Sequence, residues 1–139
     1  MGTVNAAIEW IQAKMRVLEG VRKATEAPPD KIGADMTVIA YTPSGSVRPG
    51  APARARTDFH TVHIDLMIPF KNLARDYTRL SPYIEKMATV ICSDLTWGGT
   101  VETIGAQNLD VDRTLGPDVW GDSPVMRLRF IVQIKIVQV

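Results

Sequence analysis

Two histidines spaced as His-x-x-His are the residues of this sequence whose types most readily suggest metal chemistry. His60 and His63 lie in the alternating run Phe59–Ile68, which predicts a β-strand. Three residues apart on a strand, their side chains point to opposite faces of the sheet, so they cannot share one metal ion. We interpret them as structural residues and predict no metal site.

The other candidates for catalysis or ion binding lack the partners that their chemistry needs. Asp110 and Asp112 look like the start of a calcium loop, but the later acidic ligands and the closing glutamate are missing. Cys92 has no histidine near it in sequence and falls in a helical stripe, which predicts a small buried side chain rather than a nucleophile. The sequence therefore predicts no enzyme and no cofactor.

The most unusual stretch is residues 42–57, TPSGSVRPGAPARART, which contains three prolines, three arginines and no carboxylate. Unstructured connections of this length are uncommon in small domains and are usually functional or disordered. Proline limits the entropy lost on docking, and Arg48, Arg54 and Arg56 can each bind a carboxylate through two hydrogen bonds. We interpret this segment, called the arm below, as a recognition element, against the simpler alternative of a solvated hairpin tip. Because no aromatic residue interleaves the arginines, a protein partner with an acidic rim is favoured over nucleic acid.

Composition sets the broad class. The chain has 139 residues, of which 45% are hydrophobic and 22% charged, so we expect one domain, residues 1–139, with a real core. A net charge of +1 gives no reason to expect nucleic acid or an anionic membrane as partner. Cys92 is the single cysteine and fits a reducing compartment. No apolar run approaches the ~20 residues of a membrane span, so we expect a soluble protein made in the cytoplasm.

The N-terminal segment predicts an amphipathic helix with two apolar sides. One stripe steps by four, three, four and three residues along Val4, Ile8, Ile11, Met15 and Leu18. A second, partial stripe consists of Trp10, Val17 and Val21. A helix that is apolar on more than one side predicts two contacts, of which one lies outside the subunit. Trp10 and Val17 are therefore candidates for a protein interface.

Strands are expected at Met36–Tyr41 and Phe59–Ile68, with the arm as an extended hairpin between them. A second helix is expected to begin near Asn72 or, more firmly, at Ser81-Pro82, with Ser81 as N-cap, and to end at the glycine pair 98–99. Residues 100–111 predict a broken strand, and residues 112–124, rich in turn residues, predict a loop.

The clearest strand is the C-terminal run VMRLRFIVQIKIVQV, in which six apolar residues at even positions from Met126 to Ile136 face one way. Ile131 and Val137 interrupt its polar face, so Ile131 is a further interface candidate. A strand of this length would be an aggregation hazard at an exposed edge, and we expect it to be central or covered by a neighbouring subunit. The order predicts an α+β fold: an antiparallel sheet of about four strands, two helices packed on it, and the long hairpin arm between strands 1 and 2.

This organisation resembles the tail-terminator proteins of long-tailed bacteriophages and the related neck and tail-completion proteins. The likeness covers nearly the whole chain: the helix Val4–Leu18, the strand Met36–Tyr41, the long arm, a second strand ending HIDLMIP, the helix LSPYIEKMATVICSDLTW and the closing strand MRLRFIVQIKIVQ. No single segment is a diagnostic motif, so the resemblance lies in the order and character of the elements.

The resemblance implies a virion protein at the junction of tail and neck, made in the host cytoplasm. Such a protein forms a homo-oligomeric ring, typically a hexamer, that caps the completed tail tube and offers a joining surface to the neck or connector protein. Genomic DNA would pass through the lumen without specific binding, and no membrane is involved. Three alternatives stay open: a head–tail connector ring, a non-virion adaptor, and a nucleic-acid-binding module.

Overall fold

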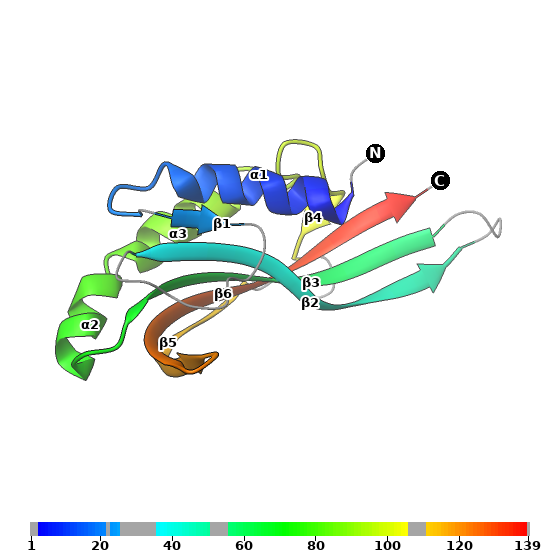
Figure 1. The fold of residues 1–139 in the computed structure, drawn as a ribbon. Coiled ribbons are helices and arrows are strands. Elements are labelled where there is room, and N and C mark those ends of the chain that lie inside the picture. The colour runs from blue at the N-terminus through cyan, green and yellow to red at the C-terminus, as the bar shows by residue number, and fades with distance from the viewer. Residues whose placement is uncertain (1–2, 22, 26–35, 51–55, 106–110, 139) are drawn as a thin grey trace.

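The computed structural model describes residues 3–21, 23–25, 36–50, 56–105 and 111–138. These residues form a six-stranded sheet and three helices (Figure 1). In chain order the elements are α1 (Val4–Arg16), β1 (Lys23–Thr25), β2 (Thr37–Pro49), β3 (Arg56–Pro69), α2 (Leu73–Leu80), α3 (Tyr83–Cys92), β4 (Thr103–Ile104), β5 (Asp112–Trp120) and β6 (Ser123–Gln138). The α+β class is confirmed, with two strands, β1 and β5, and one helix more than the sequence predicts.

The sheet is built around two long central strands, β3 and β6. The neighbour order is β1-β2-β3-β6-β4, and β5 pairs with β6 on the same side as β4. All pairs are antiparallel except β1 with β2, which is parallel. The prediction for the C-terminal strand is confirmed: β6 lies inside the sheet, between β3 and the pair β4 and β5, and so its backbone is largely protected from edge-to-edge association.

Helices cover one face of the sheet. The predicted stripes of α1 and β6 meet there, and Ile8, Ile11 and Met15 of α1 lie in one cluster with the six even-numbered apolar residues of β6. Even-numbered residues of β3 and Met87 and Ile91 of α3 complete this core. Burial of each such side chain contributes about 1.5–3 kcal/mol relative to exposure, which fixes the register of both long strands, because a slip by one residue would turn the apolar set away from the helices.

The second helical region is interrupted. Asn72 caps α2 by accepting a hydrogen bond from the Arg75 amide at 3.0 Å, as expected for the earlier of the two predicted starts. The prediction that Ser81 is an N-cap is wrong: its amide donates to Tyr77, its hydroxyl donates to Thr78, and it ends α2. Proline at 82 has no amide to continue the ladder, so α3 begins anew at Tyr83.

The prediction of a loop over residues 112–124 is also wrong. Residues Asp112–Trp120 form β5, which pairs with β6 from Ser123 to Ile131 through a tight turn at Gly121 and Asp122. The turn-forming residues that suggested a loop, Gly116 and Pro117, are compatible with β5 because it lies at the margin of the sheet. A proline at an edge strand loses no ladder hydrogen bond when its nitrogen faces away from the partner strand.

A buried glutamine of α1 completes the outer edge of β2. β1 pairs with β2 only along Thr37–Ile39. Next to this pairing, the side-chain nitrogen Nε2 of Gln12 donates a hydrogen bond to the Val38 backbone carbonyl oxygen at 3.2 Å. The side-chain oxygen Oε1 of Gln12 accepts a hydrogen bond from the Ala40 backbone amide at 2.9 Å. Gln12 therefore continues the hydrogen-bond pattern of the short parallel strand by one step.

Replacing Gln12 with leucine is expected to lower the free energy of unfolding by about 1–3 kcal/mol, because it leaves a buried donor and a buried acceptor of β2 without partners. Chemical denaturation monitored by circular dichroism measures this loss. The matched control is Glu9→Leu, an exposed position on the same helix. Equal stabilities of the two variants would contradict the bridging role of Gln12.

Among the described residues, no helix is long and apolar enough to cross a membrane.

Candidate interaction surface

The arm is mostly paired in strands: β2 and β3 continue into it as a ribbon, and β6 pairs with the β3 side of this ribbon as far as Arg56. Pairing of β2 with β3 continues through Ser44–Pro49 opposite Arg56–Thr61, after a bulge between Tyr41 and Ser44. Of the sixteen residues of the arm, 42–49 therefore lie in β2 and 56–57 lie in β3. Figure 1 shows the ribbon projecting beyond the helix layer at one end of the molecule, while α2 lies at the other end. Beyond Ala40, no strand of the described residues pairs with the outer edge of β2.

The three arginines of the arm differ in their surroundings. Arg48 is exposed and stacks its guanidinium on the Phe59 ring, 5.1 Å from the centroid, and no carboxylate of the described residues forms an ion pair with it. Arg56 is paired with Asp58 of its own strand at 3.1 Å. Arg54 lies outside the described residues. Of the two described arginines, Arg48 is thus the one that forms no ion pair with a described carboxylate.

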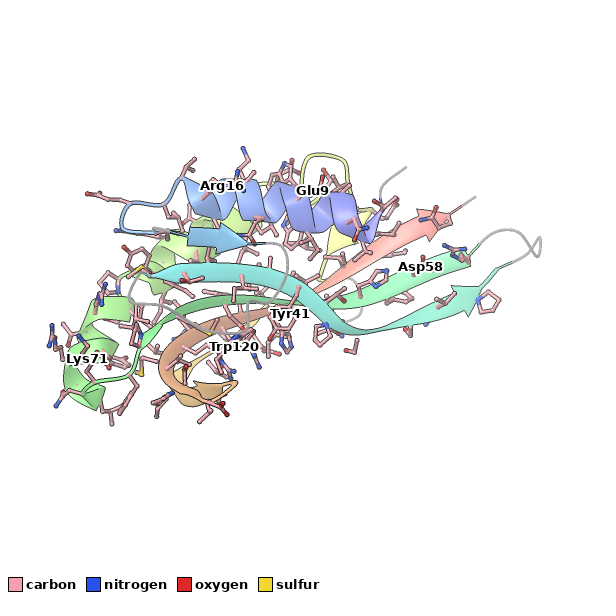
Figure 2. All side chains as sticks on the ribbon, viewed as in Figure 1. Glu9, Arg16, Tyr41, Asp58, Lys71 and Trp120 are labelled. Atoms are coloured by element: carbon pink, nitrogen blue, oxygen red, sulfur yellow. The ribbon has the colours of Figure 1, made fainter. Side chains whose placement is uncertain are left out.

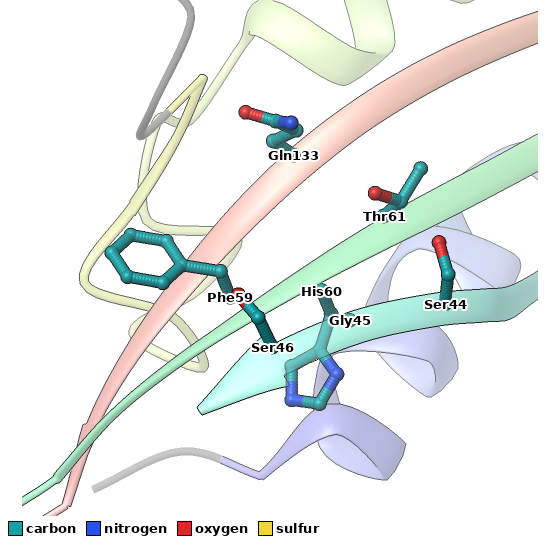
Figure 3. Close-up of a pocket in the computed structure, with 7 residues that line it drawn as sticks. All are labelled: Ser44, Gly45, Ser46, Phe59, His60, Thr61 and Gln133. Atoms are coloured by element: carbon teal, nitrogen blue, oxygen red, sulfur yellow. The ribbon is translucent and has the colours of Figure 1, made fainter. Parts of the chain in front are cut away.

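A shallow pocket of about 170 Å³ lies at the base of the arm (Figure 3). Its walls are small hydroxyl side chains from Ser44, Ser46 and Thr61, together with Gly45, Phe59, His60 and Gln133. The buried side-chain oxygen Oε1 of Gln133 accepts no hydrogen bond from the described residues. The pocket is polar, and its volume matches a single side chain or a few water molecules rather than a cofactor.

The face of the sheet opposite the helices, called the open face below, carries a polar network. Asp65 is 0% exposed, and its carboxylate accepts two hydrogen bonds from Arg129 at 2.8 and 3.0 Å and one from the Tyr41 hydroxyl at 3.0 Å. Arg129 also donates to the Tyr41 hydroxyl at 2.9 Å. Trp120 at the end of β5 packs edge-on against Tyr41, at 6.1 Å between ring centroids, and both lie on the side away from α1 (Figure 2).

This network shifts the ionisation of its members. Burial, the negative charge of Asp65 and the hydrogen bond to it raise the pKa of Tyr41 to about 12, against the opposing charge of Arg129. Burial and the positive charges of Arg129 and Arg127 lower the pKa of His63 below its ordinary 6.5, with Asp65 opposing. His63 packs edge-on against Tyr41, and its buried Nδ1 has no hydrogen-bond partner among the described residues. The arrangement keeps His63 neutral and the network closed, which is a structural role.

Lowering the pH below about 6.5 is therefore expected to destabilise the fold through His63. Its folded-state pKa is depressed, so the unfolded chain takes up the proton first, and stability present above pH 6.5 is lost as the pH falls through the folded-state pKa. Denaturation at pH 7.5 and pH 5.0 measures the effect, and His63→Gln should reduce the difference. His60→Gln is the matched control. An unchanged pH dependence in His63→Gln would contradict this assignment.

The interface candidates from the helix and the last strand do not lie together. Trp10 is half-buried and stacks on Trp97 of the same chain, with ring centroids 6.0 Å apart and planes at 14°. Its apolar character therefore has a partner within the subunit. Val17 is 80% exposed at the end of α1, whereas Ile131 is half-buried on the open face opposite His63. Val17 and Trp10 belong to the helix layer, and Ile131 to the opposite side of the sheet.

The residues tested for metal or catalytic chemistry are separated by the fold. His63 lies on the open face, and His60 points to the other face of the same regular strand, as predicted. Cys92 is exposed at the end of α3, so the prediction that it is buried is wrong. Its place at the helix terminus explains this, because the apolar stripe closes with Ile91. Asp112 lies on β5, and Asp110 is outside the described residues.

Two features of these surfaces were missed by sequence reasoning. The network of Asp65, Arg129 and Tyr41 joins residues of three strands, and their separate polar positions gave no sign of the pairing. The free outer edge of β5 was hidden by the loop prediction. The alternation of Leu115, Pro117 and Val119 with Thr114, Gly116 and Asp118 was the available signal for a strand.

Comparison with models of known protein families finds no family that matches this chain. Comparison with curated proteins likewise finds no match.

Proposed function

We propose that this protein is a structural subunit of a bacteriophage tail, which assembles as a ring, caps the completed tail tube and presents the joining surface to the neck. The observation that carries the proposal is the arm. A paired ribbon of β2 and β3, joined by β6 on its β3 side, extends beyond the helix-covered part of the sheet, and its outer β2 edge has no strand partner among the described residues while Arg48 is exposed there. A ribbon of this kind adds little to the subunit's own core and suits contact with another molecule.

The chemistry of the described residues supports a binding role. The candidates for metal ligation lie apart, the pocket at the arm is small and polar, and the buried ionisable network is closed on itself. The proposed activity is geometric: a complementary face binds the last ring of tube protein and blocks further addition. Rings of identical subunits need a head-to-tail interface, which joins two different surfaces of the same chain.

The arm can be tested at Arg48, which forms no ion pair with a carboxylate of the described residues, together with Arg54 of the same segment. Arg48→Ser combined with Arg54→Ser is expected to weaken tube capping on the order of tenfold, since loss of one good interface contact costs about 1.4 kcal/mol or more. The measurement is the fraction of capped tubes, counted by electron microscopy over a range of protein concentrations. Folding should be nearly unaffected, because the stacking of Arg48 on Phe59 contributes only about 0.5–1 kcal/mol.

The control variant is Arg75→Ser with Arg79→Ser, exposed positions on α2 at the opposite end of the molecule (Figure 1). Capping that is equally weakened by both pairs would show a general charge effect and contradict a role for the arm. A protein that ignores tubes but binds the connector would instead support the neck-ring alternative.

A further inference from the structure

Among the described residues, each of the two sides of the sheet carries a long stretch of strand with no outer partner. Along the order β2, β3, β6, β5, the outer edge of β2 in the arm and the outer edge of β5 have no strand partner among the described residues. Prolines at 43, 49 and 117 block parts of these edges, since proline has no amide hydrogen. Two stretches without proline remain, Ser44–Arg48 on β2 and Asp112–Gly116 on β5, and both are five residues long.

We propose that these two stretches pair with each other between copies of the chain, so that β2 of one copy adds to β5 of the next as an antiparallel strand. This inference rests on the proposed ring function and names its subunit interface. Strand directions agree with it, because β2, β3, β6 and β5 alternate in direction, and a second copy in the same orientation continues the alternation. The occupant of each edge is therefore a second copy of this chain.

One register keeps the open-face residues of both strands on the same face of the extended sheet and places complementary side chains opposite one another. Ser44, Ser46 and Arg48 lie on the open face, and so do Asp112, Thr114 and Gly116, as their pairings with β3 and β6 require. With Ser46 opposite Thr114, Arg48 falls opposite Asp112 and Gly45 opposite Leu115. This gives one pair of opposite charges and one pair of hydroxyl side chains, both favourable across strands.

The stagger that this register requires suits a closed assembly. Ser46 is level with Lys135 of β6, whereas Thr114 is level with Arg129, so neighbouring copies are offset by six residues along the strands. At ~3.3 Å per residue the offset is roughly 20 Å, across four strands that span roughly 19 Å at ~4.8 Å each. The resulting tilt of about 45° is at the upper end of the roughly 35–45° at which sheets close into barrels.

Cross-linking tests the contact directly. In a Cys92→Ser background, which removes the exposed native thiol, Ser46→Cys and Thr114→Cys are combined and the protein is oxidised with copper phenanthroline. Both positions are exposed, and within one copy they are separated by β3 and β6, too far apart for a disulfide. We expect a covalent ladder under non-reducing conditions that ends at one closed species, while each single variant stays at the mass of one chain.

A second experiment tests the register. Arg48→Asp and Asp112→Arg are each expected to shift the assembled fraction to lower mass in light scattering, and the double variant to restore it. Single-cysteine variants that dimerise as efficiently as the pair would overturn the proposal in favour of like-edge pairing. If the double-cysteine variant forms rings of the same mass as the unaltered protein but never cross-links, the proposed interface is overturned, while the proposed function stands. A ladder formed by a protein that does not cap tubes would support this interface and contradict the proposed function.

Discussion

Replacing Asp65 with alanine is expected to lower the free energy of unfolding by about 3–5 kcal/mol, because removal of one partner of a buried ion pair leaves the other charge unpaired. Asp65 is the acceptor for both Arg129 and Tyr41, and it is completely buried on a face of the sheet that no helix covers. The variant would therefore leave the Arg129 guanidinium and the Tyr41 hydroxyl without the carboxylate that accepts their hydrogen bonds. Urea denaturation followed by tryptophan fluorescence measures the loss.

The chain offers a matched control in a second ion pair, between β5 and β6. Arg127 forms an ion pair with Asp118 at 2.7 Å, and the side chain of Asp118 is 43% exposed. Asp118→Ala should cost no more than about 1 kcal/mol, as exposed ion pairs do. A triple variant, Asp65→Leu with Arg129→Met and Tyr41→Phe, should recover most of the stability, since apolar replacement of a whole buried network is often close to neutral. Equal losses in Asp65→Ala and Asp118→Ala would contradict the account of the network.

Replacing Trp97 with alanine is expected to cost a similar amount, about 3–5 kcal/mol, since it creates a large cavity under α1. Trp97 is completely buried, its indole nitrogen donates to the Ile91 carbonyl oxygen at 3.1 Å, and its ring stacks on Trp10. Its backbone has φ = 46°, and the adjacent Gly98 has no room for a Cβ because the Trp10 ring lies against it. The turn that carries Trp97 is therefore held against α1 by the stacking of the Trp97 and Trp10 rings.

The control is Trp10→Ala, which removes the half-buried member of the same stack and should cost clearly less than Trp97→Ala. Thermal unfolding and the near-ultraviolet circular dichroism of the ring pair measure both variants. If Trp10→Ala destabilises the fold as much as Trp97→Ala, the outer ring contributes as much as the buried one, which would contradict this assignment of the core.

The elements with regular periodicity were predictable from the sequence, and their core faces were predictable as well. The stripe of α1 and the alternation of β6 depend only on local spacing, and both stripes lie in the core cluster as expected. Gln12 was missed, although its place one turn after Ile8 in the buried stripe was a usable signal. A polar side chain on a buried stripe needs a partner, and here the partner is the edge of β2.

The pairings between strands were not predictable, because they depend on residues distant in sequence. Nothing near Asp65 indicates that Arg129 lies opposite it, since the register is set by the core on the other face of the sheet. The same limit applies to Trp10, whose apolar ring suggested an outside partner until the turn carrying Trp97 was placed against it. β5 was obscured because glycine and proline within a strand indicate a loop unless the strand is known to be an edge.

The most direct test of the proposed role is electron microscopy of the purified protein, alone and mixed with tail tubes, together with its mass from light scattering. The account predicts closed rings with a central hole, found at the ends of tubes. A protein that remains a single copy in every mixture would contradict it.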